Sequence, residues 1–424
     1  MNAGVIVFLF LLVFSFLGLP IFLSIGVGTV IAMVVGGFPL EALPQKAFLG
    51  LNSSSLLSIP FFILAGNLMA RGITQRLIAA ANVVLGRVRG SLGAVTVLAS
   101  ALFGAISGSA VATVAAIGGM TIPAMQQEGY DKEYASALAS AASLLGPMIP
   151  PSISLIVYAS LTDTSVQRLF LTTASPAIVC TIAFLIYTLV YGKRHNLPKQ
   201  PKKTLREGLH VFRESIWALL MPVLVLGSIF GGICTVNEAA AVSVVYSALV
   251  GLFVYRTITV KDLLDVLYDS AVSVAAIMIL VGFSKASSYV VIASQLPQVF
   301  METVSALTDS TFLILLIINI IFLVLGCLMD GNSILVMMVP LMLPLVQACG
   351  IDLLQFGVMS CVNIYIGCIT PPVGVSLLVG TKIGRTSMGR TFIAILPCLF
   401  ISLVILILVT YIPSFSLWLP RLLG

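Results

Sequence analysis

The sequence predicts an all-α polytopic membrane protein built from two inverted repeats, and three observations lead to this prediction. Only 8% of the 424 residues are charged, whereas a soluble domain carries about 25%. The hydrophobic fraction is 59%, which is too high for a chain whose surface faces water. Glycine and proline also recur at matched positions in the two halves of the chain, which indicates a repeat.

The composition also excludes several classes of protein. The chain has only two histidines, His195 and His210, so no HExxH metal site and no histidine-based catalytic pair is expected in the membrane. Its seven cysteines are scattered without a CxxC pair and are interpreted as apolar core residues. The net charge of +6 arises from short basic runs between apolar segments, which is typical of loops that face anionic lipid and not of nucleic-acid binding.

A membrane-spanning helix needs about 20 apolar residues. The first stretch, 4–18, follows no basic residue and has no small-residue cleavage site, so it is interpreted as a retained span and not as a signal peptide. The first half, repeat one at 1–192, is predicted to contain spans at 4–18, 20–36, 48–70 and 170–191, a basic interfacial stretch at 71–91, a re-entrant hairpin at 93–125, and a helix at 134–162 broken between Gly146 and Pro151.

A basic cytoplasmic linker at 193–213 is predicted to lead into repeat two, 214–424. Each repeat then has five spanning helices, one of them broken, and one re-entrant hairpin. The predicted segments of repeat two are spans at 215–231, 235–255, 262–284 and 391–411, an interfacial stretch at 285–310, a hairpin at 311–346, and a helix at 353–383 broken around Pro371 and Pro372.

The spacing of glycine and proline supports the repeat. An offset of 221 residues relates Gly146 to Gly367 and Pro150 to Pro371, and it also relates Pro123, Gly129 and Pro151 to Pro344, Gly350 and Pro372. An odd number of crossings per repeat inverts the second copy. With 193–213 in the cytoplasm, most Lys and Arg lie on the cytoplasmic side, as the positive-inside rule requires, and both termini are periplasmic.

Helix breaks free backbone carbonyls that lipid cannot satisfy, so the four breaks at matched positions predict a binding centre. Carbonyl and hydroxyl oxygens suit a hard cation such as Na⁺, while the N-termini of the helices that follow each break favour an anionic solute. The candidate ligands of a first sodium site are Gly104, Ser107, Gly146, Ile149 and Pro151, and those of a second are Leu325, Leu328, Gly367, Thr370 and Pro372.

Two acids are predicted to lie within spans or breaks. Asp330 lies on the second hairpin tip, opposite Ser109 by the offset, and is predicted to contact a solute or a cation. Ser109 and Ser154 are either solute contacts or hydroxyls bonded back to helix carbonyls. Glu238 is interpreted as an acid at a helix start, capped by Thr235 or by the neighbouring asparagine, with subunit docking as the alternative.

These segments together resemble the large membrane subunit of tripartite ATP-independent periplasmic (TRAP) transporters, of the DctM or SiaM kind. The likeness covers essentially the whole chain and rests on Ile-Pro-Phe-Phe-Ile-Leu-Ala-Gly at 59–66, Gly-Ser at 108–109, and the segments 146–152, 237–241 and 367–374. The resemblance implies an elevator-type secondary transporter of the bacterial inner membrane, coupled to Na⁺, that imports an organic anion.

The resemblance also implies partners and site residues. A periplasmic solute-binding protein would deliver the solute, and a small membrane subunit of about four helices would be a separate chain. Ser109, Ser154 and Asp330 match the family's solute contacts, and in the second sodium site the matched carbonyl can also be that of Val373.

Two other functions stay open at this point. One is a stand-alone Na⁺-coupled dicarboxylate carrier of related fold, which would transport without a binding protein. The other is an intramembrane aspartyl protease, in which Asp269 and Asp330 would share a proton.

Overall fold

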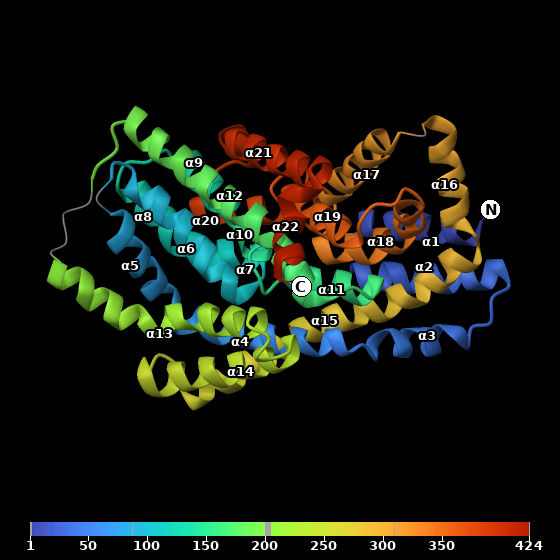
Figure 1. The fold of residues 1–424 in the computed structure, drawn as a ribbon, viewed down its shortest axis with the longest axis horizontal. Helices are drawn as coiled ribbons and strands as arrows, with labels where there is room; N and C mark the ends of the chain where they lie inside the picture. The colour runs from blue at the N-terminus through green and yellow to red at the C-terminus, as the bar shows by residue number, and fades with distance from the viewer. Residues whose placement is uncertain (1, 87, 200–204, 309, 424) are drawn as a thin grey trace.

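The computed structural model describes residues 2–86, 88–199, 205–308 and 310–423 (Figure 1). Within these ranges the regular structure is entirely helical. Seven of the described helices are long and apolar enough to cross a membrane, or eight if one bent pair counts as a single span. The prediction of an all-helical polytopic membrane protein is confirmed.

The chain begins with two apolar helices, α1 (Ala3–Phe16) and α2 (Ile21–Gly36), which pack against each other. The span predicted at 48–70 is present but begins later, at Ser54–Gly72. The residues before it belong to a separate helix, α3 (Ala42–Leu51), because the polar run at 52–55 interrupts the helix before the 3-10 turn (Ser54–Leu57) and α4 (Ser58–Gly72). A short helix, α5 (Thr74–Leu85), occupies the basic interfacial stretch.

The first predicted hairpin and the first broken helix are interrupted where the sequence predicts. The hairpin consists of α6 (Ser91–Ser107), α7 (Ala110–Thr113), a π-helical turn (Val114–Gly118) and α8 (Gly119–Gln127). The broken helix consists of α9 (Lys132–Ala142), α10 (Leu145–Met148) and α11 (Ile153–Thr162), with a bend of 42° at the break, and α12 (Val166–Arg194) follows.

The helices α13 (Leu205–Phe230), α14 (Val236–Leu249) with a π-helical turn (Val250–Val254), and α15 (Val260–Ala293) open the second half. Helix α13 begins inside the predicted linker, of which residues 200–204 lie outside the described residues. Helix α15 continues past its predicted end at 284, so Lys285 lies inside this helix. The Lys285 ammonium donates a hydrogen bond to the carbonyl of Ser160 on α11 at 2.9 Å, which satisfies the cation within the protein.

The remaining elements follow the prediction, with one addition. After α16 (Leu296–Leu307) come the hairpin helices α17 (Thr311–Gly326) and α18 (Gly331–Ala348), the broken pair α19 (Leu353–Cys368) and α20 (Val375–Gly384), and the span α21 (Met388–Tyr411). The last helix, α22 (Pro413–Leu423), is not predicted from the sequence, because its two prolines and its short length give no span signal.

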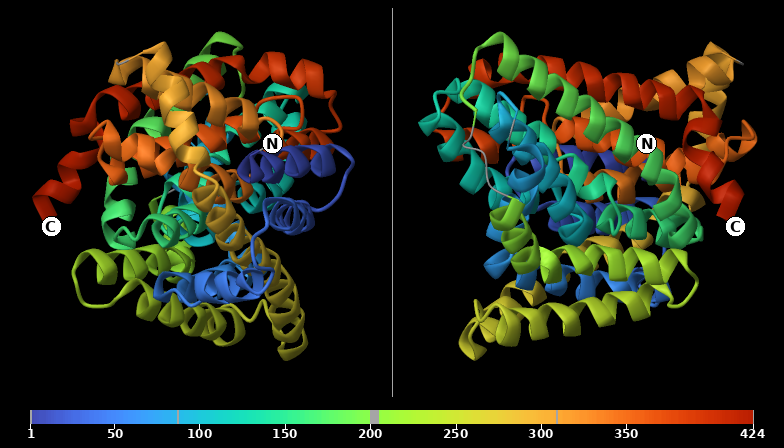
Figure 2. Two further views of the ribbon diagram at one scale, coloured as in Figure 1. Left: turned by 90° about the vertical axis from the view of Figure 1, so that its right-hand side faces the viewer. Right: turned by 60° about the vertical axis from the view of Figure 1, so that its left-hand side comes forward.

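A layer of long helices and a group of hairpins and broken helices can be distinguished in all views. Helices α3, α4, α13, α14 and α15 lie along one long side of the molecule, and the hairpins and broken helices lie on the other side of that layer (Figures 1 and 2). The rings of Tyr158, Phe322 and Phe356 join α11, α17 and α19 at the centre, with centroids 6.0 and 6.2 Å from the Phe356 ring. The two halves of the chain therefore share one core.

Glu238 closes a capping box at the start of α14. Its carboxylate accepts a hydrogen bond from the Thr235 N–H at 2.8 Å, and the Thr235 hydroxyl accepts one from the Glu238 N–H at 3.3 Å. The interpretation of Glu238 as an acid at a helix start, capped by Thr235, is confirmed.

Because a lost N-cap costs a helix about 1 kcal/mol, Thr235→Ala should lower the unfolding midpoint of the purified protein. Thr303→Ala is the matched control, since Thr303 is exposed within α16 and, among the described residues, its hydroxyl bonds only the Val299 carbonyl of its own helix. Equal midpoints for the two variants would contradict a stabilising role for this cap.

Candidate functional site

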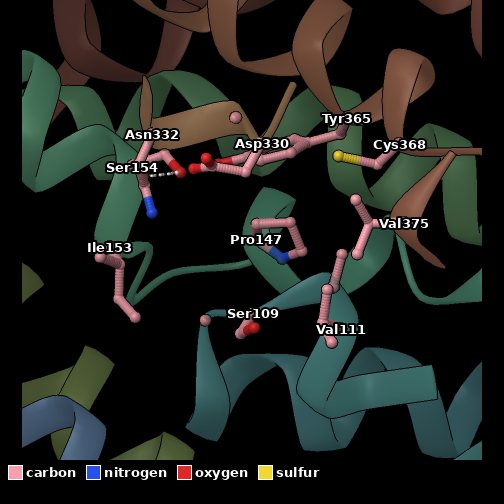
Figure 3. Close-up of a pocket in the computed structure, with 13 residues that line it drawn as sticks. Ser109, Val111, Pro147, Ile153, Ser154, Asp330, Asn332, Tyr365, Cys368 and Val375 are labelled. Atoms are coloured by element: carbon pink, nitrogen blue, oxygen red, sulfur yellow. Dashed lines mark hydrogen bonds between the residues drawn. The ribbon is translucent and has the colours of Figure 1, made fainter. Parts of the chain in front are cut away.

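A cavity of about 130 Å³ lies where the two hairpin tips meet the two helix breaks. Residues from both halves of the chain line it, and the three predicted solute contacts, Ser109, Ser154 and Asp330, are all among them. Figure 3 shows Asp330 and Ser154 on one side of the cavity and Ser109 on the other, with Pro147 between them. The structure thus brings together three predicted contacts that are up to 221 positions apart in the sequence.

The first hairpin tip is shaped by Gly108 and Ser109. Gly108 ends α6 with φ +60°, and a Cβ atom there would lie 2.4 Å from the Pro151 carbonyl oxygen, so only glycine fits. Ser109 is the N-cap of α7, where its hydroxyl accepts a hydrogen bond from the Ala112 N–H at 3.3 Å. This bond fixes the Ser109 side chain at the cavity edge.

At the second hairpin tip the N-cap residue is an aspartate, where the first tip has Ser109. Asp330 is the N-cap of α18, and its carboxylate accepts hydrogen bonds from the Ser333 N–H at 3.2 Å and from the Ser333 hydroxyl at 2.5 Å. The Asp330 side chain is exposed, and its carboxylate keeps lone pairs for a further partner.

Two polar residues of the cavity were not found from the sequence. The Ser154 hydroxyl donates to the Asn332 side-chain oxygen at 2.8 Å, which ties α11 to the start of α18. The hydroxyl of Tyr365 lies 3.3 Å from that of Ser152. Asn332 belongs to the tip segment that the sequence marks as a break, whereas Tyr365 has no matched polar residue in the first half, so no sequence signal points to it.

The cavity has an unusual balance of charge for an anion site. Its polar groups are the Asp330 carboxylate, the Asn332 amide and hydroxyls, and its apolar lining includes Val111, Ile153 and Val375. The described lining residues include no Lys, Arg or His. A carboxylate here therefore needs a cation, or donor groups on the solute, as its partner.

The predicted first sodium site lies around the contact between the first hairpin and its broken helix. A Cβ on Gly104 would lie 2.5 Å from the Gly146 Cα, so the two backbones touch. The buried Ser107 hydroxyl lies 3.4 Å from that of Thr113. In the described part of the chain, no hydrogen bond is donated to the carbonyls of Ile149 and Pro151, and these oxygens are available to a cation.

In the second half the first arm of the hairpin is shifted by one residue relative to the 221 offset. The glycine that packs on Gly367 is Gly326, whereas the offset from Gly104 gives Leu325. The Leu325 carbonyl already accepts the N–H groups of Leu328 and Met329 at 2.9 and 3.0 Å. The second tip is therefore one residue shorter than the first, and the equivalence of Leu325 to Gly104 is wrong.

The other predicted ligands of the second sodium site stay near this contact. The Val373 N–H donates to the Cys327 carbonyl at 3.1 Å, which fastens the broken segment to the hairpin tip. Among the described residues, no hydrogen bond is donated to the carbonyls of Leu328, Thr370 and Pro372. The Pro150–Pro151 and Pro371–Pro372 peptide bonds are both cis, so the two breaks share this local geometry.

The aspartyl dyad of a protease is absent. Asp269 pairs with Arg71 at 3.4 Å on an exposed face of α15 and is not among the residues that line the Asp330 cavity. The two carboxylates therefore do not share a site.

The fold and the cavity define a polytopic membrane transport protein, and comparisons with known proteins assign its family. The model of the family described as tripartite ATP-independent periplasmic transporter, DctM component, matches residues 7–415. The chain belongs to this family. It is accordingly a transporter permease component and not an enzyme.

Relatives with TRAP transporter names match nearly the whole chain. The C4-dicarboxylate TRAP transporter large permease protein DctM of Pseudomonas aeruginosa is 39% identical over 385 residues, 91% of this chain and 90% of that protein. The sialic acid TRAP transporter large permease protein SiaM of Vibrio cholerae is 34% identical, with 96% of each chain covered. The isethionate TRAP transporter permease protein DctMQ of Oleidesulfovibrio alaskensis is 33% identical over 97% of this chain and 66% of its own length.

Solved structures share the fold at low sequence identity. The YdaH transporter of Alcanivorax borkumensis superposes with a TM-score of 0.59 at 16% identity and covers 98% of this chain and 99% of its own. MtrF of Neisseria gonorrhoeae gives the same TM-score at 11% identity, with 91% and 84% covered. These likenesses concern the fold alone.

Proposed function

We propose that this protein is the membrane permease subunit of a Na⁺-coupled secondary transporter of the bacterial inner membrane, which imports an organic acid delivered by a periplasmic solute-binding protein. The observation that carries the proposal is the convergence of two hairpin tips and two helix breaks on one cavity. The relatives named above are permeases for C4-dicarboxylates, sialic acid and isethionate, which are all organic acids.

Sodium coupling is supported by the chemistry of the site. An organic anion beside the Asp330 carboxylate, in a cavity whose described lining has no basic side chain, requires compensating positive charge. The carbonyls of Ile149, Pro151, Thr370 and Pro372, which accept no hydrogen bond from the described residues, belong to the two helix breaks and are hard oxygen ligands. A bound Na⁺ would supply the charge, so that cation and solute bind together.

An elevator movement is supported by the division of the fold. The hairpins and broken helices touch through bare glycine backbones, at Gly104 with Gly146 and at Gly326 with Gly367, and form one packed unit. That unit lies against the layer of α3, α4, α13, α14 and α15 (Figure 2). We propose that this unit moves relative to the layer during transport. We also propose that a small four-helix membrane subunit, a separate chain, binds this protein. Both termini are proposed to be periplasmic.

Reconstitution into liposomes tests the proposal. We expect uptake of a labelled carboxylate only when the chain is combined with its small membrane subunit and its binding protein, and only with an inward Na⁺ gradient. Uptake by the chain alone would favour the stand-alone carrier, and uptake that persists when K⁺ replaces Na⁺ would contradict sodium coupling.

A further inference from the structure

A second cavity, of about 350 Å³, is lined by residues of α5, of the first half of α13 and of the turn that follows α14. It is separate from the solute cavity and has the opposite character, because Arg76, His210, Arg213, Trp217 and Tyr255 line it together with one acid and one valine. An adjoining cavity of about 480 Å³ shares His210 and Arg213 with it. We propose that this basic cavity binds the phosphodiester headgroup of an anionic phospholipid.

The Arg76 guanidinium is positioned at the cavity by an aromatic ring and a carboxylate. It lies over the Tyr255 ring, 4.1 Å from the centroid, and 3.8 Å from the Glu214 carboxylate. The ring is itself fixed, because the Tyr255 hydroxyl donates to the Glu214 carbonyl at 2.8 Å and accepts from the Ala218 N–H at 3.1 Å. At 3.8 Å the Glu214 contact is an ion pair and not a hydrogen bond, so it leaves the Arg76 N–H donors for a phosphate oxygen.

Arg213 supplies the second charge. Its side chain is exposed and has no hydrogen bond or ion pair with any described residue. Glu214 is the lining acid and lies 3.3 Å from His210 as well as near Arg76. The two arginines exceed this single carboxylate by one formal charge, which matches the single negative charge of a phosphodiester.

The surroundings favour a lipid over a soluble phosphate. The apolar span predicted from the sequence begins at 215, next to Arg213, so the cavity is expected at a membrane boundary on the predicted cytoplasmic side. The side chains of Leu209 and Trp217, which line the two adjoining cavities, are 71% and 44% exposed and give acyl chains an apolar surface to follow. Tryptophan and tyrosine at a headgroup boundary are typical of the interfacial aromatic belt.

Native mass spectrometry of the delipidated full-length chain, titrated with phosphatidylglycerol or phosphatidylethanolamine, tests this proposal. We expect preferential binding of phosphatidylglycerol, with a loss of about tenfold or more in the double variant Arg76→Gln/Arg213→Gln, because each arginine near an anionic headgroup contributes about 1 kcal/mol. Arg213→Gln alone should lose part of this affinity, and it removes only an exposed side chain, so it tests the site even if the Arg76 change impairs folding.

The matched control is Arg194→Gln/Arg390→Gln, which removes two exposed arginines outside the cavity. We expect this control to bind phosphatidylglycerol like the unmodified chain. An equal loss in the control, or equal binding of both lipids by the unmodified chain, would overturn the proposal. Displacement of the lipid by millimolar inorganic phosphate would also overturn it, in favour of a soluble anion.

Discussion

Gly367→Ala is expected to destabilise the protein by about 3 kcal/mol, the upper end of the usual cost of overpacking. A Cβ at this position would lie 2.3 Å from the carbonyl carbon and 2.4 Å from the Cα of Gly326. Both neighbours are backbone atoms, so no side-chain rotation can relieve the clash. The measurement is the unfolding midpoint of the detergent-purified protein, together with the yield of monodisperse material.

The corresponding change in the first half, Gly146→Ala, should cost less, about 2 kcal/mol. Its Cβ would meet the Thr113 hydroxyl at 2.6 Å, which can rotate away, but also the Ser109 carbonyl oxygen at 2.9 Å, which cannot. Gly227→Ala is the control, since Gly227 lies within α13 with nothing near its Cβ position, and alanine there favours the helix. A midpoint for Gly367→Ala equal to that of Gly227→Ala would show that the two backbones are not in contact.

The helix breaks were predictable because their causes are local. A proline pair interrupts a helix wherever it occurs, because proline has no N–H to donate and its ring clashes with the preceding turn. The one-residue difference between the two hairpin tips was not predictable from the proline matches, because an offset measured after the tip says nothing about the register before it. The close approach of Gly326 to Gly367 is a tertiary contact, and only the structure shows it.

Lys285 shows the same limit in another way. A lysine marks the end of a predicted span, because an unpaired ammonium in lipid is costly. In the structure α15 continues past Lys285. The Lys285 ammonium donates a hydrogen bond to the Ser160 carbonyl of α11, so it has a polar partner within the protein. The residues of the solute cavity were likewise predictable only in part. The hairpin-tip residues of the cavity are local features that the sequence indicates, whereas Tyr365 joins the cavity only through the packing of α19.

Asp330→Asn is expected to reduce solute uptake by about tenfold to a hundredfold while leaving the protein folded. Asparagine caps a helix about as well as aspartate, so the start of α18 and its bond from the Ser333 N–H are retained. What is lost is the negative charge at the cavity, and an interaction of a charged group is worth about 1.5–3 kcal/mol. Initial uptake rates in liposomes, at matched protein incorporation, measure the effect.

Asp352→Asn is a closely matched control for this variant. Asp352 is also an exposed N-cap aspartate, of α19, and its carboxylate accepts the Leu354 N–H at 2.7 Å, but it does not line the cavity. The two changes remove the same charge and preserve the same kind of cap, so a loss of uptake in Asp330→Asn alone assigns the effect to the cavity. Equal uptake by both variants would remove Asp330 from the site.

The dependence of the residual uptake on Na⁺ then identifies the partner of the carboxylate. If Asp330 faces a bound cation, the amide variant should need a higher Na⁺ concentration for half-maximal uptake, because a neutral oxygen holds Na⁺ less strongly than a carboxylate does. If Asp330 instead accepts hydrogen bonds from the solute, the concentration of solute at half-maximal uptake should rise and the Na⁺ dependence should stay unchanged. With no Lys, Arg or His among the described lining residues, we expect the first result.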